Sequence, residues 1–452
     1  MYSKFRACLG ILAAALLLAA CAAPSPAVQA PPPPTSAPAE APQAAQPAAA
    51  GKFRIWKQFA DGDDLLMELM APWAKENNVE IELTSGIDDM AKYIAAITGG
   101  DPPDLIILSG PDDIGTWARE GLVVELDDVI KTQGINLDEI FPGPLSTCRY
   151  FGKLYCLPWG TDVYALFWNK DLFKEAGLDP ERPPETLEEL ALFAEKLTKY
   201  DADGNLTQIG FLPNFSWSHI DTYALAFGAA PFSEDGTKVT INSPEFIQAM
   251  EWQRQFYTKV GFDKIDKFTQ GFGEYSSPQA GFNAGKVAMM IEGEWQPKFI
   301  REAGVTNLNY GIAAPPHPAN HPERAGTVSV GGTVMAIATG VKNPELSAKA
   351  LAFLQSPGPL ADFMVFNNNL PTTKSAAQDP RFRQDEKFAI FMDLLAGPNA
   401  KSFTRTPINS EVFAAISEAE EMSFRDPNFD LKAFLDAKAA ELQPLLDKAN
   451  SR

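Results

Sequence analysis

Apolar and polar positions alternate between strand-like and helix-like spacing from about residue 52 onward. The apolar run at 105–108 (Leu-Ile-Ile-Leu) is typical of a strand that is covered on both faces. Asp63 or Asp64 is expected to cap a helix that Pro72 kinks. Strands are also predicted at 53–56 and 79–83, and a short helix at 114–119. This βαβαβ order predicts an α/β fold built on a parallel sheet with helices on its faces.

Start signals for helices continue through the later chain. Thr186 and Glu189 have the spacing of a capping box, and Ser243-Pro244 and Asn343-Pro344 place proline at the first position of two more helices. Buried strands are predicted at 287–291 and 334–337. The C-terminal part of the chain is expected to be mostly helical, and the sequence contains no internal repeat.

The first fifty residues differ in character from the rest. Lys4 and Arg6 precede a short apolar stretch, and Leu18-Ala19-Ala20-Cys21 resembles a bacterial lipoprotein box. We therefore expect a signal peptide at 1–20 and a lipid on the sulfur of Cys21, with an ordinary signal peptide and an incidental cysteine as the alternative. The segment 21–51 is rich in alanine and proline, which predicts an extended tether.

Composition narrows the class of partner. The chain has 452 residues and a formal net charge of -20, from 38 basic and 58 acidic side chains. Its length suggests two or three domains, and 45% hydrophobic residues are enough for a sizeable core. Nucleic acids and anionic membrane surfaces both attract a basic protein surface, so this acidic composition argues against either as a partner.

Two cysteines, Cys148 and Cys156, follow the predicted anchor. Outside the reducing cytosol, a pair eight residues apart predicts a disulfide that closes a small hairpin. Two free thiols remain the alternative. A zinc site is disfavoured because no histidine lies close to this pair.

Few patterns point to catalysis or to a bound metal. The sequence has three histidines and contains no nucleophile elbow, phosphate loop, zinc-protease helix or dinucleotide fingerprint. Glu292 and Glu294 could belong to a glycosidase carboxylate pair, which is a weak signal in so acidic a chain. The segment 201–205 opens like a calcium loop, but Leu212 stands where the bidentate glutamate is needed, so a polar turn is preferred and calcium stays open. We expect no enzyme, no cofactor and no metal site.

Several tryptophans lie beside glycine, proline or polar residues instead of within apolar runs. Trp159 precedes a glycine, Trp217 lies between two serines, and Trp295 follows a glutamate. A sugar ring has an apolar C–H face and a polar rim, so a flat aromatic ring beside carboxylates and amides suits it. One such tryptophan alone is more often a core residue. Several of them on loops at strand ends favour a ligand cleft.

A longer pattern is specific to one family. The segment 167–178 (Phe-Trp-Asn-Lys-Asp-Leu-Phe-Lys-Glu-Ala-Gly-Leu), followed by Pro-Pro-Glu-Thr-Leu-Glu-Glu-Leu at 183–190, resembles the family 1 extracellular solute-binding proteins, the sugar-type receptors of ABC importers. Further matches lie in order at 100–105, 155–158, 282–289, 331–332 and 370–372. The resemblance implies a two-lobe periplasmic-binding-protein fold of type II-like topology. Each lobe is then a mainly parallel sheet flanked by helices, and a hinge joins the two.

The resemblance also implies the domain plan and the function. The N-lobe is expected at 52–160 with 328–371, and the C-lobe at 161–327 with 372–452. A carbohydrate, a mono- or oligosaccharide, is expected to bind between the lobes and to pass to the transmembrane subunits of an ABC permease. The receptor is expected to be a monomer that is lipid-anchored outside the cell membrane, or periplasmic. In the alternative, the same two lobes bind a glycerol phosphodiester, a polyol or another polar solute. A surface glycosidase is a remote alternative.

Ligand contacts carry over from the family only loosely. Trp159 lies where the family often places a cleft aromatic, and Trp295 matches a ring that stacks on sugar. Gly331 and Gly332 match a turn that approaches ligand closely. Arg405 could form a forked bond to ligand oxygens. Further candidates, most of them at strand ends expected to face the cleft, are Asp61, Asp63, Ser109, Asp112, Asp162 and Trp217.

Overall fold

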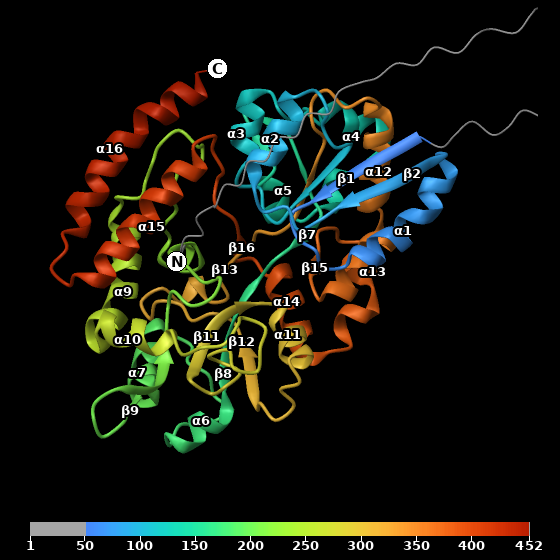
Figure 1. Ribbon diagram of the computed structural model, residues 1–452. Coiled ribbons are helices and arrows are strands. Elements are labelled where there is room, and N and C mark those ends of the chain that lie inside the picture. The colour runs from blue at the N-terminus through green and yellow to red at the C-terminus, as the bar shows by residue number, and fades with distance from the viewer. Residues whose placement is uncertain (1–50, 452) are drawn as a thin grey trace, which may run out of the picture. The chain divides into compact units, whose positions relative to one another are not determined.

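The computed structural model describes residues 51–451 of the chain (Figure 1). The predicted signal peptide at 1–20, the predicted lipid at Cys21 and the tether up to residue 50 lie outside the described residues. Residue 51 already belongs to the first strand. None of the described helices is long and apolar enough to cross a membrane.

The first sheet joins strands from distant parts of the chain, in the order β2-β1-β3-β14-β6. Its strands are β1 (Gly51–Lys57), β2 (Val79–Thr84), β3 (Leu105–Leu108), β6 (Leu157–Pro158) and β14 (Val334–Ala336). β1 is parallel to β2 and β3, with α1 (Asp63–Glu76) and α2 (Met90–Thr98) in the connections, which confirms the βαβαβ prediction. β14 runs antiparallel to both β3 and β6. The sheet is therefore mixed, because a returning segment enters it in the opposite direction.

The second sheet has the order β12-β8-β11-β10-β9. Its strands are β8 (Tyr164–Asn169), β9 (Lys199–Tyr200), β10 (Leu206–Phe211), β11 (Val287–Gly293) and β12 (Tyr310–Ala313). Only β10 and β11 pair in parallel among these strands, so the prediction of a mainly parallel sheet is wrong here. A short turn joins β9 to β10, and strands joined in that way must run antiparallel.

Most predicted helix starts are confirmed. The side chains of Thr186, Ser243 and Asn343 each accept a backbone N–H at the starts of α7 (Leu187–Leu197), α9 (Pro244–Val260) and α12 (Pro344–Gln355). The cap predicted for α1 is wrong, because Gly62 occupies that position and no side chain caps the helix. The remaining α-helices before residue 400 are α3 (Ile114–Glu120), α4 (Asp127–Gln133), α5 (Pro142–Ser146), α6 (Lys170–Glu175), α8 (Ile220–Ala224), α10 (Phe262–Thr269), α11 (Gln296–Glu302), α13 (Pro357–Asn367) and α14 (Glu386–Ala396).

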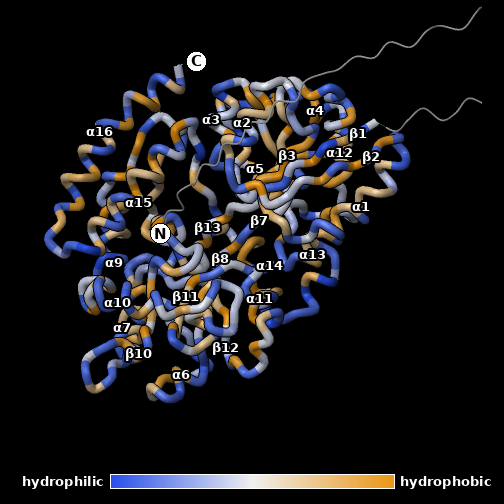
Figure 2. The backbone as a smooth tube through the Cα atoms, in the orientation of Figure 1, coloured by the Kyte–Doolittle hydropathy of each residue, from blue (hydrophilic) through white to orange (hydrophobic). Residues whose placement is uncertain are grey.

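The chain ends in two long helices, α15 (Asn409–Arg425) and α16 (Leu431–Asn450). The buried residues of α16 recur every three or four positions, so the helix packs with one face. Figure 2 shows the matching alternation of hydrophobic and hydrophilic residues along α16. α15 packs against both α16 and α9, which fastens the end of the chain to the second sheet's helices.

The chain passes three times between the two sheets. The first passage contains β7 (Gly160–Thr161), the second contains β13 (Val328–Ser329), and the third contains β15 (Leu370–Pro371). β7 pairs with β15, and β13 pairs with β16 (Ala400–Lys401), so these segments also bind one another. Figure 1 shows β7, β13 and β15 between the strands of the two sheets. The predicted lobe boundaries at 160, 327 and 371 fall on or next to these passages.

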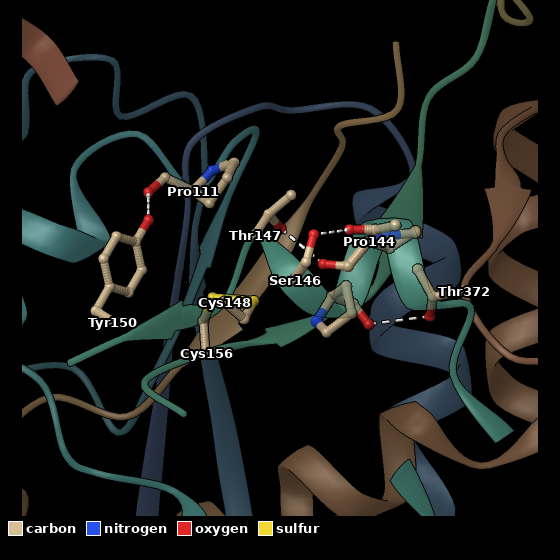
Figure 3. Close-up of a disulfide and its surroundings, with 10 residues drawn as sticks. Pro111, Pro144, Ser146, Thr147, Cys148, Tyr150, Cys156 and Thr372 are labelled. Atoms are coloured by element: carbon tan, nitrogen blue, oxygen red, sulfur yellow. Dashed lines mark hydrogen bonds between the residues drawn. A yellow bond between two sulfur atoms is a disulfide. The ribbon is translucent and has the colours of Figure 1, made fainter. Parts of the chain in front are cut away.

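A disulfide hairpin supports the loop that follows β3. Cys148 and Cys156 are bonded around β4 (Arg149–Tyr150) and β5 (Lys153–Leu154), as predicted (Figure 3). Phe151 and Gly152 form the tight turn, both with positive φ. The hydroxyl of Tyr150 donates to the Pro111 carbonyl at 2.9 Å. The hairpin thereby braces the segment that carries Asp112.

Replacing both cysteines by alanine should lower the free energy of unfolding by about 2–3 kcal/mol, because the unfolded chain loses its short cross-link. Urea unfolding of the double variant and of the wild type measures the difference. Wild-type protein kept reduced serves as the matched control and should lose a similar amount. An unchanged free energy of unfolding in both samples would contradict a structural role for the bond.

Glu420 on α15 holds the start of α8 from inside the protein. Its carboxylate accepts the Ile220 N–H at 3.1 Å, and the residue is 4% exposed. Burial, aided by repulsion from Asp221, raises the pKa of Glu420 from 4.5 to about 8. The folded state therefore binds this proton more tightly than the unfolded state does. The contribution of this proton to the free energy of unfolding is complete below about pH 4.5. It is lost as the pH rises toward about 8.

Glu420→Gln removes the titrating carboxyl and keeps an oxygen that can accept from Ile220. Between about pH 5 and about pH 8, the free energy of unfolding of the wild type should fall more steeply than that of the variant. Urea unfolding at several pH values measures both slopes. Glu421→Gln, on the exposed neighbouring position, is the control and should keep the wild-type slope. Equal slopes for the wild type and Glu420→Gln would refute the role of this carboxyl.

Candidate functional site

The carboxyl end of β1 is organised around a buried lysine. The Lys57 amino group donates to the Asp61 carbonyl at 2.7 Å and lies 2.8 Å from an Asp63 carboxylate oxygen. Burial lowers the pKa of Lys57, while Asp63 opposes that shift. Ser85 donates to the other oxygen of Asp63. Asp63, a predicted ligand contact, is thus already engaged by the protein.

Two further predicted residues, Ser109 and Asp112, follow β3 at the same edge of the first sheet. Ser109 is exposed and gives both its N–H and its hydroxyl to Gln58 Oε1, at 3.0 and 2.7 Å. Asp112 Oδ1 accepts from Arg405 Nη1 at 2.6 Å and from Asn409 Nδ2 at 3.0 Å. The fold therefore pairs two predicted site residues that are 293 positions apart.

Arg405 lies among acidic side chains. Its side chain is 11% exposed, and its Nε has no hydrogen-bond partner among residues 51–451. Asp221, on α8 after the carboxyl end of β10, has a pKa that burial raises and that His219 and Arg405 hold down. Asp112 adds repulsion to Asp221. We did not predict Asp221 from the sequence, where its position shortly after a strand is the only signal.

Asp162 lies on the first passage between the sheets, beside Glu294. Asn369 Nδ2 donates to Glu294 Oε1 at 3.0 Å and lies 3.4 Å from Asp162 Oδ1. The Val163 N–H donates to Glu294 Oε2 at 3.0 Å. Burial raises the pKa of Asp162 to about 6, and burial with repulsion from Asp162 raises the pKa of Glu294 well above its usual value.

Aromatic rings gather where β11 ends. Trp295 is partly exposed, donates its indole N–H to the Tyr275 hydroxyl at 2.6 Å and meets Tyr164 edge to face at 5.8 Å between ring centroids. A Cβ on Gly293 would lie 2.3 Å from the Trp295 ring, so this ring position requires glycine there. Trp217 is 59% exposed and meets Tyr275 at 6.5 Å. Trp217 and Trp295, both predicted as ligand contacts, therefore belong to one cluster of aromatic rings with Tyr164 and Tyr275.

Tyr164 connects the acidic and aromatic parts of the site. It begins β8 and lies opposite Gly293 in the strand register. Burial raises its pKa, and the next causes are the negative charges of four carboxyls. These carboxyls belong to Asp162, Asp221, Glu292 and Glu294. Tyr164 therefore responds to the charges of all four carboxyls, although its sequence context gave no reason to select it.

Two predicted contacts take other roles. Trp159 is 0% exposed, stacks on Phe363 at 4.2 Å and gives its indole N–H to the Leu354 carbonyl, so it is a core residue and not a candidate contact. Gly332 has φ 114°, and a Cβ there would lie 2.5 Å from the Gly160 carbonyl oxygen. This glycine lets two passages between the sheets approach each other. Gly331 is partly exposed, and a Cβ there would meet nothing within 4 Å.

The described residues offer no metal site built from three or more histidine, cysteine or acidic side chains. The turn at 201–205 is polar, as preferred from the sequence. Asp201 Oδ1 accepts the backbone N–H groups of Asp203 and Asn205, both at 2.9 Å. The hydrogen bond from the Asn205 side chain, together with these backbone bonds, lowers the pKa of Asp201.

Comparison with known proteins points to the family that the sequence resembles. The family model for the bacterial extracellular solute-binding protein matches residues 55–360. The maltotriose-binding protein of Pyrococcus abyssi (strain GE5 / Orsay) is 24% identical over 391 residues, covering 85% of this chain and 80% of that protein. The sn-glycerol-3-phosphate-binding periplasmic protein of Escherichia coli (strain K12) is 27% identical over 317 residues and 67% of each chain.

Solved structures share the fold. CpMnBP1 with mannobiose bound superposes with a TM-score of 0.75 at 27% identity, covering 86% of this chain and 99% of that one. The sugar-binding protein MalE from Xanthomonas citri superposes with a TM-score of 0.70 at 19% identity, covering 88% and 98%, which is a likeness of fold alone. The family model matches more than half of the chain and agrees with the motifs in the sequence. This chain therefore belongs to the family of bacterial extracellular solute-binding proteins.

Proposed function

We propose that this protein is the extracytoplasmic receptor of an ABC importer and captures a carbohydrate, a mono- or oligosaccharide, between its two sheets. The observation that carries the proposal is the partly exposed Trp295 ring, which lies against Tyr164 at strand ends that also bear carboxyls. An aromatic face suits the C–H side of a sugar, and carboxyls accept bonds from its hydroxyls. The maltotriose-binding relative and the mannobiose-bound neighbour support this class of ligand.

Capture works by bringing two lobes together around the ligand. Asp112 belongs to the segment after β3, whereas Trp295 and Asp221 follow strands of the second sheet. A sugar that contacts both groups binds a closed arrangement better than an open one and therefore favours closure. The lobes proposed here are those expected from the sequence, divided at the passages between the sheets. Closure then presents a surface that the permease can distinguish.

The receptor is proposed to stay at the outer face of the cell membrane. A lipid on Cys21 would anchor it, and the alanine- and proline-rich segment that follows would act as a spacer. We propose that it acts as a monomer. The partners are the sugar and the transmembrane subunits of the permease.

A glycerol phosphate or phosphodiester is the second candidate ligand, favoured by the glycerol-phosphate-binding relative. The site's charges oppose it. Arg405 is already paired with Asp112, and Asp221 lies close to both. A phosphate would meet these acids with few free positive charges to balance it. The glycosidase alternative fits less well, because both Glu292 and Glu294 are 0% exposed.

Trp295→Ala should weaken sugar binding about tenfold or more, because the ligand loses its aromatic platform. Titration calorimetry with mannobiose and maltotriose measures the change, and sn-glycerol 3-phosphate serves as the competing ligand. Tyr200→Ala, which removes another exposed aromatic ring on β9, should leave the affinity unchanged. Tight binding of sn-glycerol 3-phosphate, with no binding of either sugar, would contradict the carbohydrate proposal. An unchanged sugar affinity in Trp295→Ala would remove this residue from the site.

A further inference from the structure

A buried hydrogen bond joins α15, near the end of the chain, to the start of α8. Glu420 Oε1 accepts the Ile220 N–H at 3.1 Å, although the two residues are 200 positions apart. Glu420 is 4% exposed and Ile220 is 1% exposed. Burying a carboxyl is unfavourable, and an apolar side chain in the same place would avoid that cost. The position therefore calls for a role that an apolar residue cannot perform.

The start of α8 depends on this bond. α8 has five residues, and a helix so short is not stable by itself. The first N–H groups of a helix have no partner within the helix. His219 precedes α8 and forms no side-chain cap, so Glu420 supplies the acceptor for the first N–H. A distant helix, and not the local sequence, thus fixes where α8 begins.

Asp221 is the residue that this arrangement presents to the candidate site. It directly follows Ile220, and it is the one residue of α8 that is not buried. Burial raises the pKa of Asp221, while the positive charges of His219 and Arg405 lower it. The carboxyl of Asp221 therefore responds to the charged group around Arg405, whereas the rest of α8 packs inward.

The same helix α15 also holds the other members of that charged group. Asn409, its first residue, donates to Asp112 Oδ1 at 3.0 Å. Arg405, just before the helix, donates to the same oxygen at 2.6 Å. Glu420 lies about three turns further along α15. One helix therefore binds the Arg405–Asp112 pair at its start and the beginning of α8 further on.

We propose that Glu420 is a positioning residue of the ligand site: by fixing the start of α8, it holds Asp221 in place relative to Arg405 and Asp112. The inference rests on the proposed function and deepens it, because it names a buried residue on which sugar affinity depends. A ligand hydroxyl then meets a carboxylate that is already ordered, and binding does not have to pay the entropy of ordering it.

Variants at Glu420 separate the hydrogen bond from the stability of the fold. Glu420→Leu and Glu420→Met remove the acceptor with side chains of similar size, and Glu420→Gln keeps an oxygen that can accept from Ile220. Ile416→Val trims another buried side chain of α15 and is the control for a loss of stability alone. At about pH 6, below the pKa of about 8, the wild-type carboxyl is largely protonated and comparable with glutamine.

Calorimetry with mannobiose and maltotriose then measures sugar affinity under conditions in which urea unfolding shows every variant to be folded. Glu420→Leu and Glu420→Met should weaken binding about fivefold or more. Glu420→Gln and Ile416→Val should stay within about twofold of the wild type.

A double-mutant cycle tests whether Glu420 acts through Asp221. Asp221→Asn alone should weaken sugar binding about tenfold. Adding Glu420→Leu to Asp221→Asn should change the affinity by less than about twofold, because the carboxyl that Glu420 positions is already gone. A merely structural role for Glu420 predicts the same loss in both backgrounds.

Hydrogen exchange of the ligand-free protein gives a readout that needs no sugar. The 218–224 segment should exchange faster in Glu420→Leu than in the wild type, and Glu420→Gln should match the wild type. Three results would overturn the inference: unchanged sugar affinity in Glu420→Leu, equal losses in both backgrounds of the cycle, or unchanged exchange in this segment. Failure of the proposed function looks different, because the wild type would then bind neither sugar while the exchange result still shows whether Glu420 fixes α8.

Discussion

The insertion of β14 between β3 and β6 constrains everything else in this molecule. β14 follows the strands of the second sheet in the sequence but pairs in the first sheet. The chain must therefore cross between the two sheets. β7 and β15 pair the first passage with the third, and an isolated bridge between Val163 and Val330 pairs the first with the second. Asp162 lies on one passage and Asn369 on another, so the connections themselves supply part of the site.

The second constraint is electrostatic. Asp162 and Glu294 are held close together, and Glu292 lies two positions before Glu294 at the end of β11. All three have raised pKa values, and burial is the largest cause for each. Their hydrogen bonds to Asn369, to the Val163 N–H and to the Gly293 N–H offset only part of the cost of burial. A ligand with neutral hydroxyls can bond to the partly exposed Asp162 without adding charge. The same arrangement opposes phosphate, for which Arg405 is already engaged.

Local features of the fold could be predicted from the sequence, while the neighbours of each site residue could not. Helix caps such as Thr186 and the Cys148–Cys156 pair depend on residues a few positions apart, and both predictions are confirmed. Trp159 had the sequence context of a loop ligand but stacks on Phe363, about two hundred residues away. Tyr164 enters the site because the β8–β11 register sets it opposite Gly293. Such pairings follow from topology, which local patterns do not specify.

The central claim is that a sugar draws two halves of the molecule together without being changed. Spin labels at Lys92→Cys on α2 and Glu195→Cys on α7 would report the distance between the helices that flank each sheet. We expect saturating mannobiose or maltotriose to shorten and narrow the distance distribution, and the sugar to be recovered intact. A distribution that does not change while calorimetry shows bound sugar would contradict the account.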